Sequence, residues 1–168
     1  MYDKCSKSLA IHAAEVFATM TGHKPTLRGT KLTDHDSLMP NYTLGERVDF
    51  QGKSADGGKV EGYFICAFET MVSARLFAKD IASYLGLSAV DANNETDSFV
   101  GEFLNVVIGL TCSAWADHGF RVEFNPPQIL KEHVIDTGTK PGVFYLLVIS
   151  AEGFYQTSIF LHFYLDTD

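Results

Sequence analysis

The sequence predicts an α+β fold in which a mainly antiparallel sheet packs against helices, one of them long and central. Three observations predict it: apolar residues recur at helical spacing in three stretches, two strand–turn–strand pairs are present, and the elements run helix, hairpin, two helices, then three or four strands. The composition shows no linker and no low-complexity segment, so we expect one domain spanning residues 1–168.

The individual elements follow from local patterns. The predicted helices are residues 8–20, 69–85 and 97–117. The predicted strands are residues 47–51, 60–68, 120–124, 129–135, 142–149 and 154–165. Gly22 and Pro25 end the first helix, and the polar, glycine-rich residues 54–58 form the first hairpin turn. Residues 26–42 are expected to form a connection with one short strand, and residues 91–96 a polar link without regular structure.

Composition restricts the possible partners. The chain has 168 residues, 46% of them hydrophobic, which is enough apolar material for one core. Its 21 acidic against 13 basic residues give a formal charge of −8, which disfavours binding to nucleic acid or to an anionic membrane. The N-terminus lacks the pattern of a signal peptide, and residues 143–149, the longest apolar run, are too few to span a bilayer. A cytoplasmic protein is therefore expected.

The cysteines and histidines predict no metal site. Three cysteines, at positions 5, 66 and 112, fit neither a disulfide framework nor a zinc site and are expected to be reduced. The six histidines show no spacing typical of a metal site, and the local cluster at residues 34–36 is interpreted as a solvated loop.

The long helix predicted at residues 97–117 has two unequal faces. Plotted at roughly 100° per residue, most of its circumference is apolar and is expected to lie in the core. These apolar residues are Phe99, Val100, Phe103, Leu104, Val106, Val107, Ile108, Leu110, Ala114 and Trp115. The remaining narrow strip consists of Ser98, Glu102, Asn105, Gly109, Cys112, Ser113 and Ala116. Small residues in its C-terminal half would let another surface approach the backbone closely.

Glu102 and Asn105 are the candidate functional residues. They stand at i and i+3, where Cβ atoms are about 5–6 Å apart and side chains share a direction, so both can enter one pocket. A carboxamide has a donor and an acceptor and suits the holding of an attacking water, while a carboxylate suits pairing with a lysine of a partner. A Glu-x-x-Asn match alone is also common on ordinary helix surfaces.

The wider pattern resembles the CheC, CheX and FliY phosphatases of bacterial chemotaxis. Their signature is Asp or Ser, three residues, Glu, two residues, Asn, and later Pro. Here it is present as Ser98, Glu102 and Asn105, with Gly109 four residues on and Pro126-Pro127 later. The stretch 97–109 is similar to a CheX helix in particular, and the element order is consistent with a CheC/CheX-like fold.

The resemblance implies a protein phosphatase that hydrolyses the aspartyl phosphate of a CheY-like receiver domain. In such enzymes the receiver supplies Mg²⁺, so the protein needs no cofactor of its own. By similarity, Asn105 orients the water and Glu102 pairs with a receiver lysine, with Ser98, Gly109 and Ser113 as the supporting strip. The family also implies a homodimer formed through sheet edges.

The first predicted helix lacks a second copy of the motif. CheC members carry one there, and the matching positions in this chain are Ser8, His12 and Glu15, which leaves one active strip, as is usual for CheX. The residues 110–113 depart from the CheX pattern, and residues 22–42 have no counterpart. Two alternatives remain: a non-catalytic CheX-like adaptor that binds a signalling partner, and a small-ligand sensor.

Overall fold

The computed structural model describes residues 2–32, 43–68, 70–130, 143–151 and 155–166 of the chain. The helices of the described residues are α1 (Tyr2–Thr21), α2 (Met71–Tyr84), α3 (Ala89–Asn94) and α4 (Thr96–Asp117). The strands of the described residues are β1 (Thr26–Leu32), β2 (Leu44–Lys53), β3 (Lys59–Phe68), β4 (Arg121–Phe124), β5 (Gln128–Leu130), β6 (Val143–Ala151) and β7 (Tyr155–Asp166).

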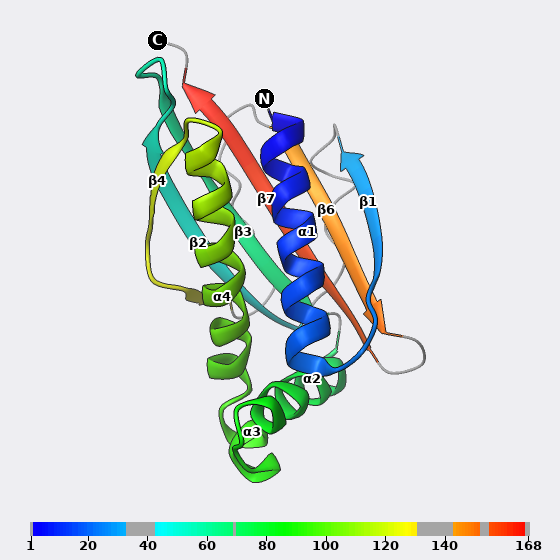
Figure 1. Cartoon of the computed structure of the whole chain (residues 1–168). Coiled ribbons are helices and arrows are strands. Elements are labelled where there is room, and N and C mark those ends of the chain that lie inside the picture. The colour runs from blue at the N-terminus through cyan, green and yellow to red at the C-terminus, as the bar shows by residue number, and fades with distance from the viewer. Residues whose placement is uncertain (1, 33–42, 69, 131–142, 152–154, 167–168) are drawn as a thin grey trace.

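One antiparallel sheet contains all the described strands (Figure 1). Its order is β1-β6-β7-β3-β2-β4, and β5 also pairs with β2. The hairpin β6–β7 lies between β1 and β3, so that Leu27 faces Ile149 on one side and Phe160 faces Ile65 on the other. The α+β fold with a mainly antiparallel sheet is confirmed.

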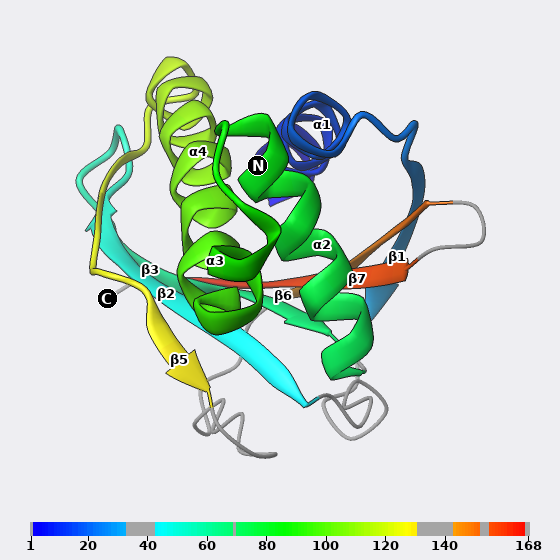
Figure 2. The same cartoon turned by 90° about the horizontal axis from the view of Figure 1, so that it is seen from below.

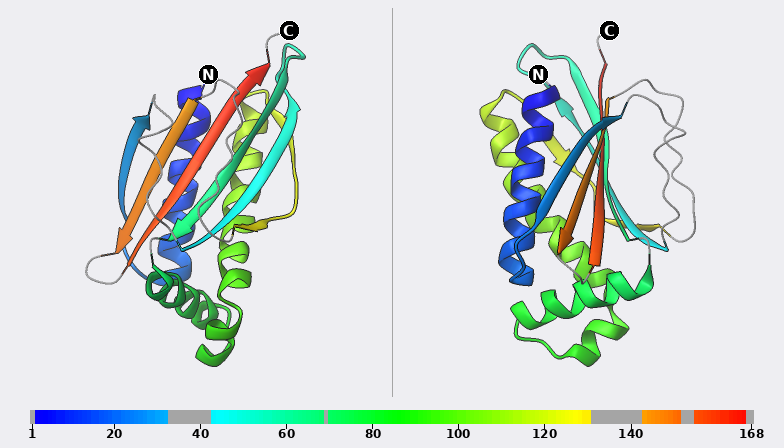
Figure 3. Two further views of the ribbon diagram at one scale, coloured as in Figure 1. Left: turned by 180° about the vertical axis from the view of Figure 1, so that it is seen from behind. Right: turned by 90° about the vertical axis from the view of Figure 1, so that its right-hand side faces the viewer.

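Two long helices, α1 and α4, lie side by side on one face of this sheet (Figures 1 and 3). They run in opposite directions, because Trp115 near the end of α4 contacts Cys5 and Ser8 near the start of α1. The shorter helices α2 and α3 lie together across one end of the layer (Figure 2). The helix layer therefore presents the outward face of α4 to solvent.

Aromatic side chains join α4 to the sheet. The indole of Trp115 is fully buried and packs against Phe50 of β2 and Phe64 of β3, with ring centroids 5.3 and 5.6 Å apart. Phe103 meets Phe77 of α2 edge to face at 5.1 Å. Each such buried side chain contributes roughly 1.5–3 kcal/mol through removal of apolar surface from water. The assignment of Trp115 to the core is confirmed.

The ends of the helices match the sequence signals. Gly22 and Gly119 follow α1 and α4 with φ of 72° and 86°, a left-handed conformation that glycine adopts without strain. The helix α1 begins earlier than predicted, at Tyr2.

The prediction that residues 91–96 lack regular structure was wrong. They include most of α3 and the first residue of α4, and Ser88 caps α3 in a capping box with Asp91. Such a box nucleates a helix of only six residues, which is too short to show a helical period. The predicted loop at 34–36 and the later part of the predicted strand 129–135 lie outside the described residues.

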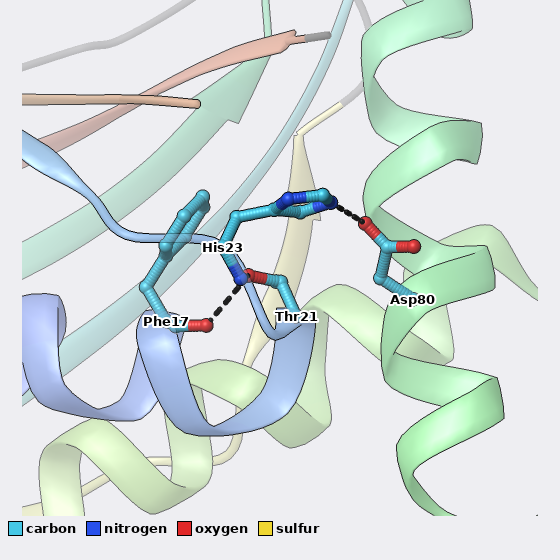
Figure 4. Close-up of polar contacts among 4 residues, drawn as sticks. All are labelled: Phe17, Thr21, His23 and Asp80. Carbon is cyan, nitrogen blue, oxygen red and sulfur yellow. Dashed lines mark hydrogen bonds and ion pairs between the residues drawn. The ribbon is translucent and has the colours of Figure 1, made fainter. Parts of the chain in front are cut away.

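A polar contact joins the chain after α1 to α2 (Figure 4). The Nε2 atom of His23 lies 3.4 Å from Oδ2 of Asp80, and the His23 amide donates to Oγ1 of Thr21 at 3.2 Å. The Thr21 hydroxyl in turn donates to the carbonyl oxygen of Phe17 at 2.8 Å, which satisfies one carbonyl of the last helical turn. These bonds fix the exit of the chain from α1.

Within the described residues, α4 is the one helix long and apolar enough to cross a membrane by length and composition. Half of its most apolar window is buried against the rest of the protein. Core helices of soluble proteins have this same property, so the finding is weak support for a membrane span.

Candidate functional site

Helix α4 buries one face and exposes another, as predicted, but the buried face does not take up most of its circumference. Its buried residues are Thr96, Phe99, Val100, Gly101, Phe103, Leu104, Val107, Ile108, Thr111 and Trp115. Its exposed residues are Ser98, Glu102, Asn105, Val106, Gly109, Leu110, Ser113, Ala116 and Asp117. The placement of Val106 and Leu110 in the core was wrong, because they are 38% and 44% exposed. The exposed face is therefore wider and more apolar than the predicted strip.

Glu102 and Asn105 both lie on this exposed face. They are separated by three residues of continuous helix, so their Cβ atoms are about 5–6 Å apart and point the same way. Within the described part of the chain, neither side chain forms a hydrogen bond or an ion pair. A carboxylate and a carboxamide are thus presented together to solvent, with their hydrogen-bonding capacity available to a second molecule.

The supporting residues leave the backbone near this pair accessible. A Cβ placed on Gly109 would meet nothing within 4 Å. The hydroxyl of Ser113 points back along the helix to the Gly109 carbonyl oxygen at 3.4 Å. Ser98 is exposed near the start of α4. The C-terminal half of the exposed face could therefore be approached closely by another surface.

A buried carboxyl group lies beneath the same helix, and sequence reasoning missed it. Glu46 of β2 is 2% exposed, and its Oε2 lies 2.9 Å from where a Cβ on Gly101 would stand. Burial raises the pKa of Glu46 to about 7, the nearby Asp97 raises it too, and a backbone hydrogen bond from Gly101 lowers it. Strand alternation could have revealed this position, because Val48 and Phe50 share its face of β2.

The matching positions on α1 are arranged differently. Ser8 is half-buried, donates to the Cys5 carbonyl oxygen at 2.9 Å and accepts from the Trp115 indole at 3.0 Å. His12 is half-buried, with Nδ1 3.5 Å from Oγ1 of Thr111. Glu15 is exposed. Two of the three positions are thus engaged with α4, and they do not form a second outward-facing pair.

Cysteine and metal chemistry receive no support from the described residues. Within the described residues, Cys5, Cys66 and Cys112 form no disulfide bond, and burial raises the pKa of Cys5 to about 11 and also raises that of Cys112. These two thiols are therefore held in the protonated form at neutral pH. No group of three or more metal-ligating side chains occurs in the part of the chain that the structure describes.

A shallow hollow of about 380 Å³ lies near the turn of the β2–β3 hairpin. It is lined by Gln51, Gly52, Lys53, Lys59, Arg121 and Glu123. None of the predicted site residues lines this hollow. Two of its lining residues, Lys53 and Lys59, are exposed to solvent. It is not the closed pocket that a small-ligand sensor would need.

Comparison with known proteins defines the class of fold. No protein-family model matches the sequence, and no curated protein sequence matches it significantly. Solved structures do match across nearly the whole chain, and they assign a CheC/CheX-like fold, as predicted from the motif on α4.

Three solved structures illustrate the similarity. A CheC-like superfamily protein from Shewanella sp. PV-4 matches with a TM-score of 0.76 at 17% identity, covering 98% of this chain and 99% of that one. The chemotaxis protein CheX from Vibrio vulnificus matches with a TM-score of 0.74 at 17% identity, over 95% and 99%. CheX in a CheX–CheY–BeF3–Mg²⁺ complex from Borrelia burgdorferi matches with a TM-score of 0.68 at 14% identity, over 94% and 96%.

Proposed function

We propose that this protein is a phosphatase that hydrolyses the aspartyl phosphate of a CheY-like receiver domain. The observation that carries the proposal is the joint exposure of Glu102 and Asn105 on one face of α4, next to the open backbone at Gly109. The similar fold of a CheX protein solved with CheY supports a receiver as the partner. We also propose that residues 1–168 act as one cytoplasmic domain.

Asn105 acts in this proposal on the attacking water. Its carboxamide accepts one hydrogen bond from the water and donates another to it, which places the water oxygen in line with the phosphorus–oxygen bond to aspartate. The water oxygen forms a bond to phosphorus, and the bond between phosphorus and the aspartate oxygen breaks. The aspartate carboxylate is thereby regenerated, and the water protons pass to phosphate and solvent. The receiver supplies Mg²⁺, so no cofactor of this chain takes part.

Glu102 acts in docking. Its carboxylate pairs with a lysine of the receiver near the phosphate, and this charge-assisted contact orients the two proteins. Val106 and Leu110 lie on the same exposed face and add apolar surface to the contact. The two residues therefore have separate roles: Glu102 binds the receiver and Asn105 positions the water.

The assembly proposed is a homodimer formed through sheet edges. Among the described strands, β1 and β4 lie at the two ends of the pairing order and offer unpaired backbone groups. Sedimentation at several protein concentrations tests this part separately from the enzymatic proposal.

The decisive experiment measures the lifetime of phosphorylated receivers, tested as a panel, with and without this protein. We expect the wild type to shorten the lifetime of at least one receiver, and Asn105→Ala to reduce that acceleration by about 100-fold or more. Asn93→Ala, which removes an exposed asparagine of α3, is the matched control and should behave as the wild type. Full acceleration by Asn105→Ala would remove Asn105 from the mechanism.

Binding measurements separate docking from chemistry. Glu102→Ala should weaken binding to a receiver carrying beryllofluoride by about 10–100-fold, because a charge-assisted contact is lost. Glu15→Ala, which removes an exposed glutamate of α1, is the control. A protein that binds receivers but never shortens their phosphorylated lifetime would be the adaptor instead.

A further inference from the structure

We propose that Glu46 is a positioning residue that holds the Glu102–Asn105 pair in its working orientation through the backbone of Gly101, and that loss of its proton loosens this hold. The inference rests on the proposed function for its effect on activity. Its structural half concerns this chain alone and can be tested without a receiver.

Contact between β2 and α4 is the first step of the argument. Glu46 is 2% exposed, and its carboxyl oxygens would lie 2.9 and 3.5 Å from a Cβ on Gly101. A Cβ at 2.9 Å from Oε2 would force the carboxyl group to shift, so glycine allows this group to lie directly against the helix backbone. Gly101 immediately precedes Glu102, and Asn105 follows one turn later. A shift of the helix at Gly101 therefore moves both candidate residues.

Among the residues that the structure describes, no cationic side chain pairs with Glu46. Asp97 on α4, one helical turn before Gly101, is the acidic neighbour that disfavours a second negative charge. Across the sheet, Glu46 pairs with Cys66 of β3 and Ile129 of β5, and Cys66 is buried. The pairs between β4 and β2 lie further along, at residues 50–53 of β2.

The nearest cation on β2 faces the other way. Arg47 points to the opposite side of the sheet, where its guanidinium lies 2.6 Å from Asp49. Within the described residues around Glu46, the Gly101 N–H is the group that stabilises the ionised carboxylate.

The protonated and ionised forms of Glu46 therefore act differently on α4. The neutral carboxyl group fits beneath the helix without repelling Asp97. The ionised carboxylate is desolvated and is repelled by Asp97. It is therefore stabilised if α4 moves outward or if water enters. Because burial brings the pKa of this group to about 7, the two forms exchange across neutral pH.

Solution NMR tests the structural half on the protein alone. The ¹³C carboxyl resonance of Glu46 and the amide resonances of Gly101, Glu102 and Asn105 are followed from about pH 5 to about pH 9. We expect all four to titrate with one midpoint near 7, and Glu46→Gln to abolish the amide shifts. Amides that stay still while Glu46 titrates, or that shift equally in Glu46→Gln, would overturn the proposal.

Receiver dephosphorylation tests the functional half. After subtraction of the receiver's own hydrolysis at each pH, acceleration by the wild type should fall by up to about tenfold between about pH 6 and about pH 8. Glu46→Gln should flatten this profile, whereas Glu123→Gln, on exposed β4, should keep the profile of the wild type. A fall of the same size in Glu46→Gln would overturn the coupling. No acceleration at any pH would instead refute the proposed function, and the NMR result would still decide the role of Glu46.

Discussion

The helices α1 and α4 lie on the same face of the sheet, but their polar residues differ in whether they contact the protein or face solvent. Both lie on one face of the sheet, both bury an apolar face, and each carries a serine at the start of a similar sequence frame, Ser8 and Ser98. On α1 that frame turns partly inward, and Ser8 bonds to Cys5 and Trp115. On α4, Ser98, Glu102 and Asn105 face solvent. Two helices of the same layer thus differ in whether their polar side chains are engaged within the described protein or are open to a second molecule.

Loss of the indole that joins the two helices should have the largest effect. Trp115→Ala should lower the free energy of unfolding by about 3–5 kcal/mol, because it empties a fully buried site. Urea unfolding followed by circular dichroism measures this. Trp115→Phe is the control and should cost clearly less, since it keeps most of the apolar volume. Equal stability of Trp115→Ala and the wild type would contradict the packing of α4 on the sheet.

The buried carboxyl beneath α4 should make stability depend on pH. The folded-state pKa of Glu46 is about 7, above its ordinary value of 4.5, so the folded protein keeps a proton that the unfolded chain releases. The contribution of Glu46 to the free energy of unfolding must therefore fall as the pH rises from about 4.5 to about 7. Glu46→Gln should be more stable than the wild type at about pH 8, on the order of 1–3 kcal/mol, and equally stable near pH 4.5.

Urea unfolding at both pH values, with Glu123→Gln as the reference, measures that difference. A gain in Glu46→Gln that is the same at the two pH values would point to better packing of the amide rather than to titration.

Substitution of two glycines of α4 by alanine should change the free energy of unfolding in opposite directions. Gly109→Ala should raise the free energy of unfolding by about 0.5–1 kcal/mol, since the new Cβ meets nothing within 4 Å and alanine favours the helix. Gly101→Ala should lower it by about 1–2 kcal/mol through the collision with Glu46. Thermal unfolding of both variants measures the contrast. Combining Gly101→Ala with Glu46→Ala should relieve the collision, so additive effects would contradict the contact.

The two serines give the smallest and most direct test of the comparison. Ser8→Ala should lower the free energy of unfolding by about 0.5–1.5 kcal/mol, because it removes two hydrogen bonds between buried or half-buried groups. Ser98→Ala should change it by less than about 0.5 kcal/mol, as for most exposed positions. Chemical unfolding of the pair measures the difference. Equal losses of stability in Ser8→Ala and Ser98→Ala would mean that the hydrogen bonds of Ser8 do not distinguish α1 from α4.

The long periodic elements and the short strand β4 were predictable from sequence, and the short helix α3 was not. Residues 97–117 and the two hairpins have enough repeats for the period to be recognised, and all three are present. The six-residue α3 depends on the capping box of Ser88 with Asp91, which is a local signal that can be read only if it is looked for.

The candidate site was predictable as a face but not in its full extent. Glu102 and Asn105 were correctly placed on the exposed side, because carboxylate and carboxamide side chains are rarely buried without partners. Val106 and Leu110 were misplaced, because hydrophobicity cannot distinguish a buried valine or leucine from one kept exposed. Glu46 was overlooked because the predicted strand began at residue 47, whereas β2 begins at Leu44, and because charged residues are usually solvated.

The order of the strands has a consequence for how the chain can be shortened. The strand β1, near the N-terminus, pairs with β6, and β3 pairs with β7, so both depend on the hairpin closest to the C-terminus. A polypeptide cut off before residue 143 would leave β1 without a neighbour and would bare the whole hydrogen-bonding edge of β3. An open edge of that length invites pairing between molecules. We therefore expect incomplete chains released by the ribosome to aggregate instead of forming a smaller working domain.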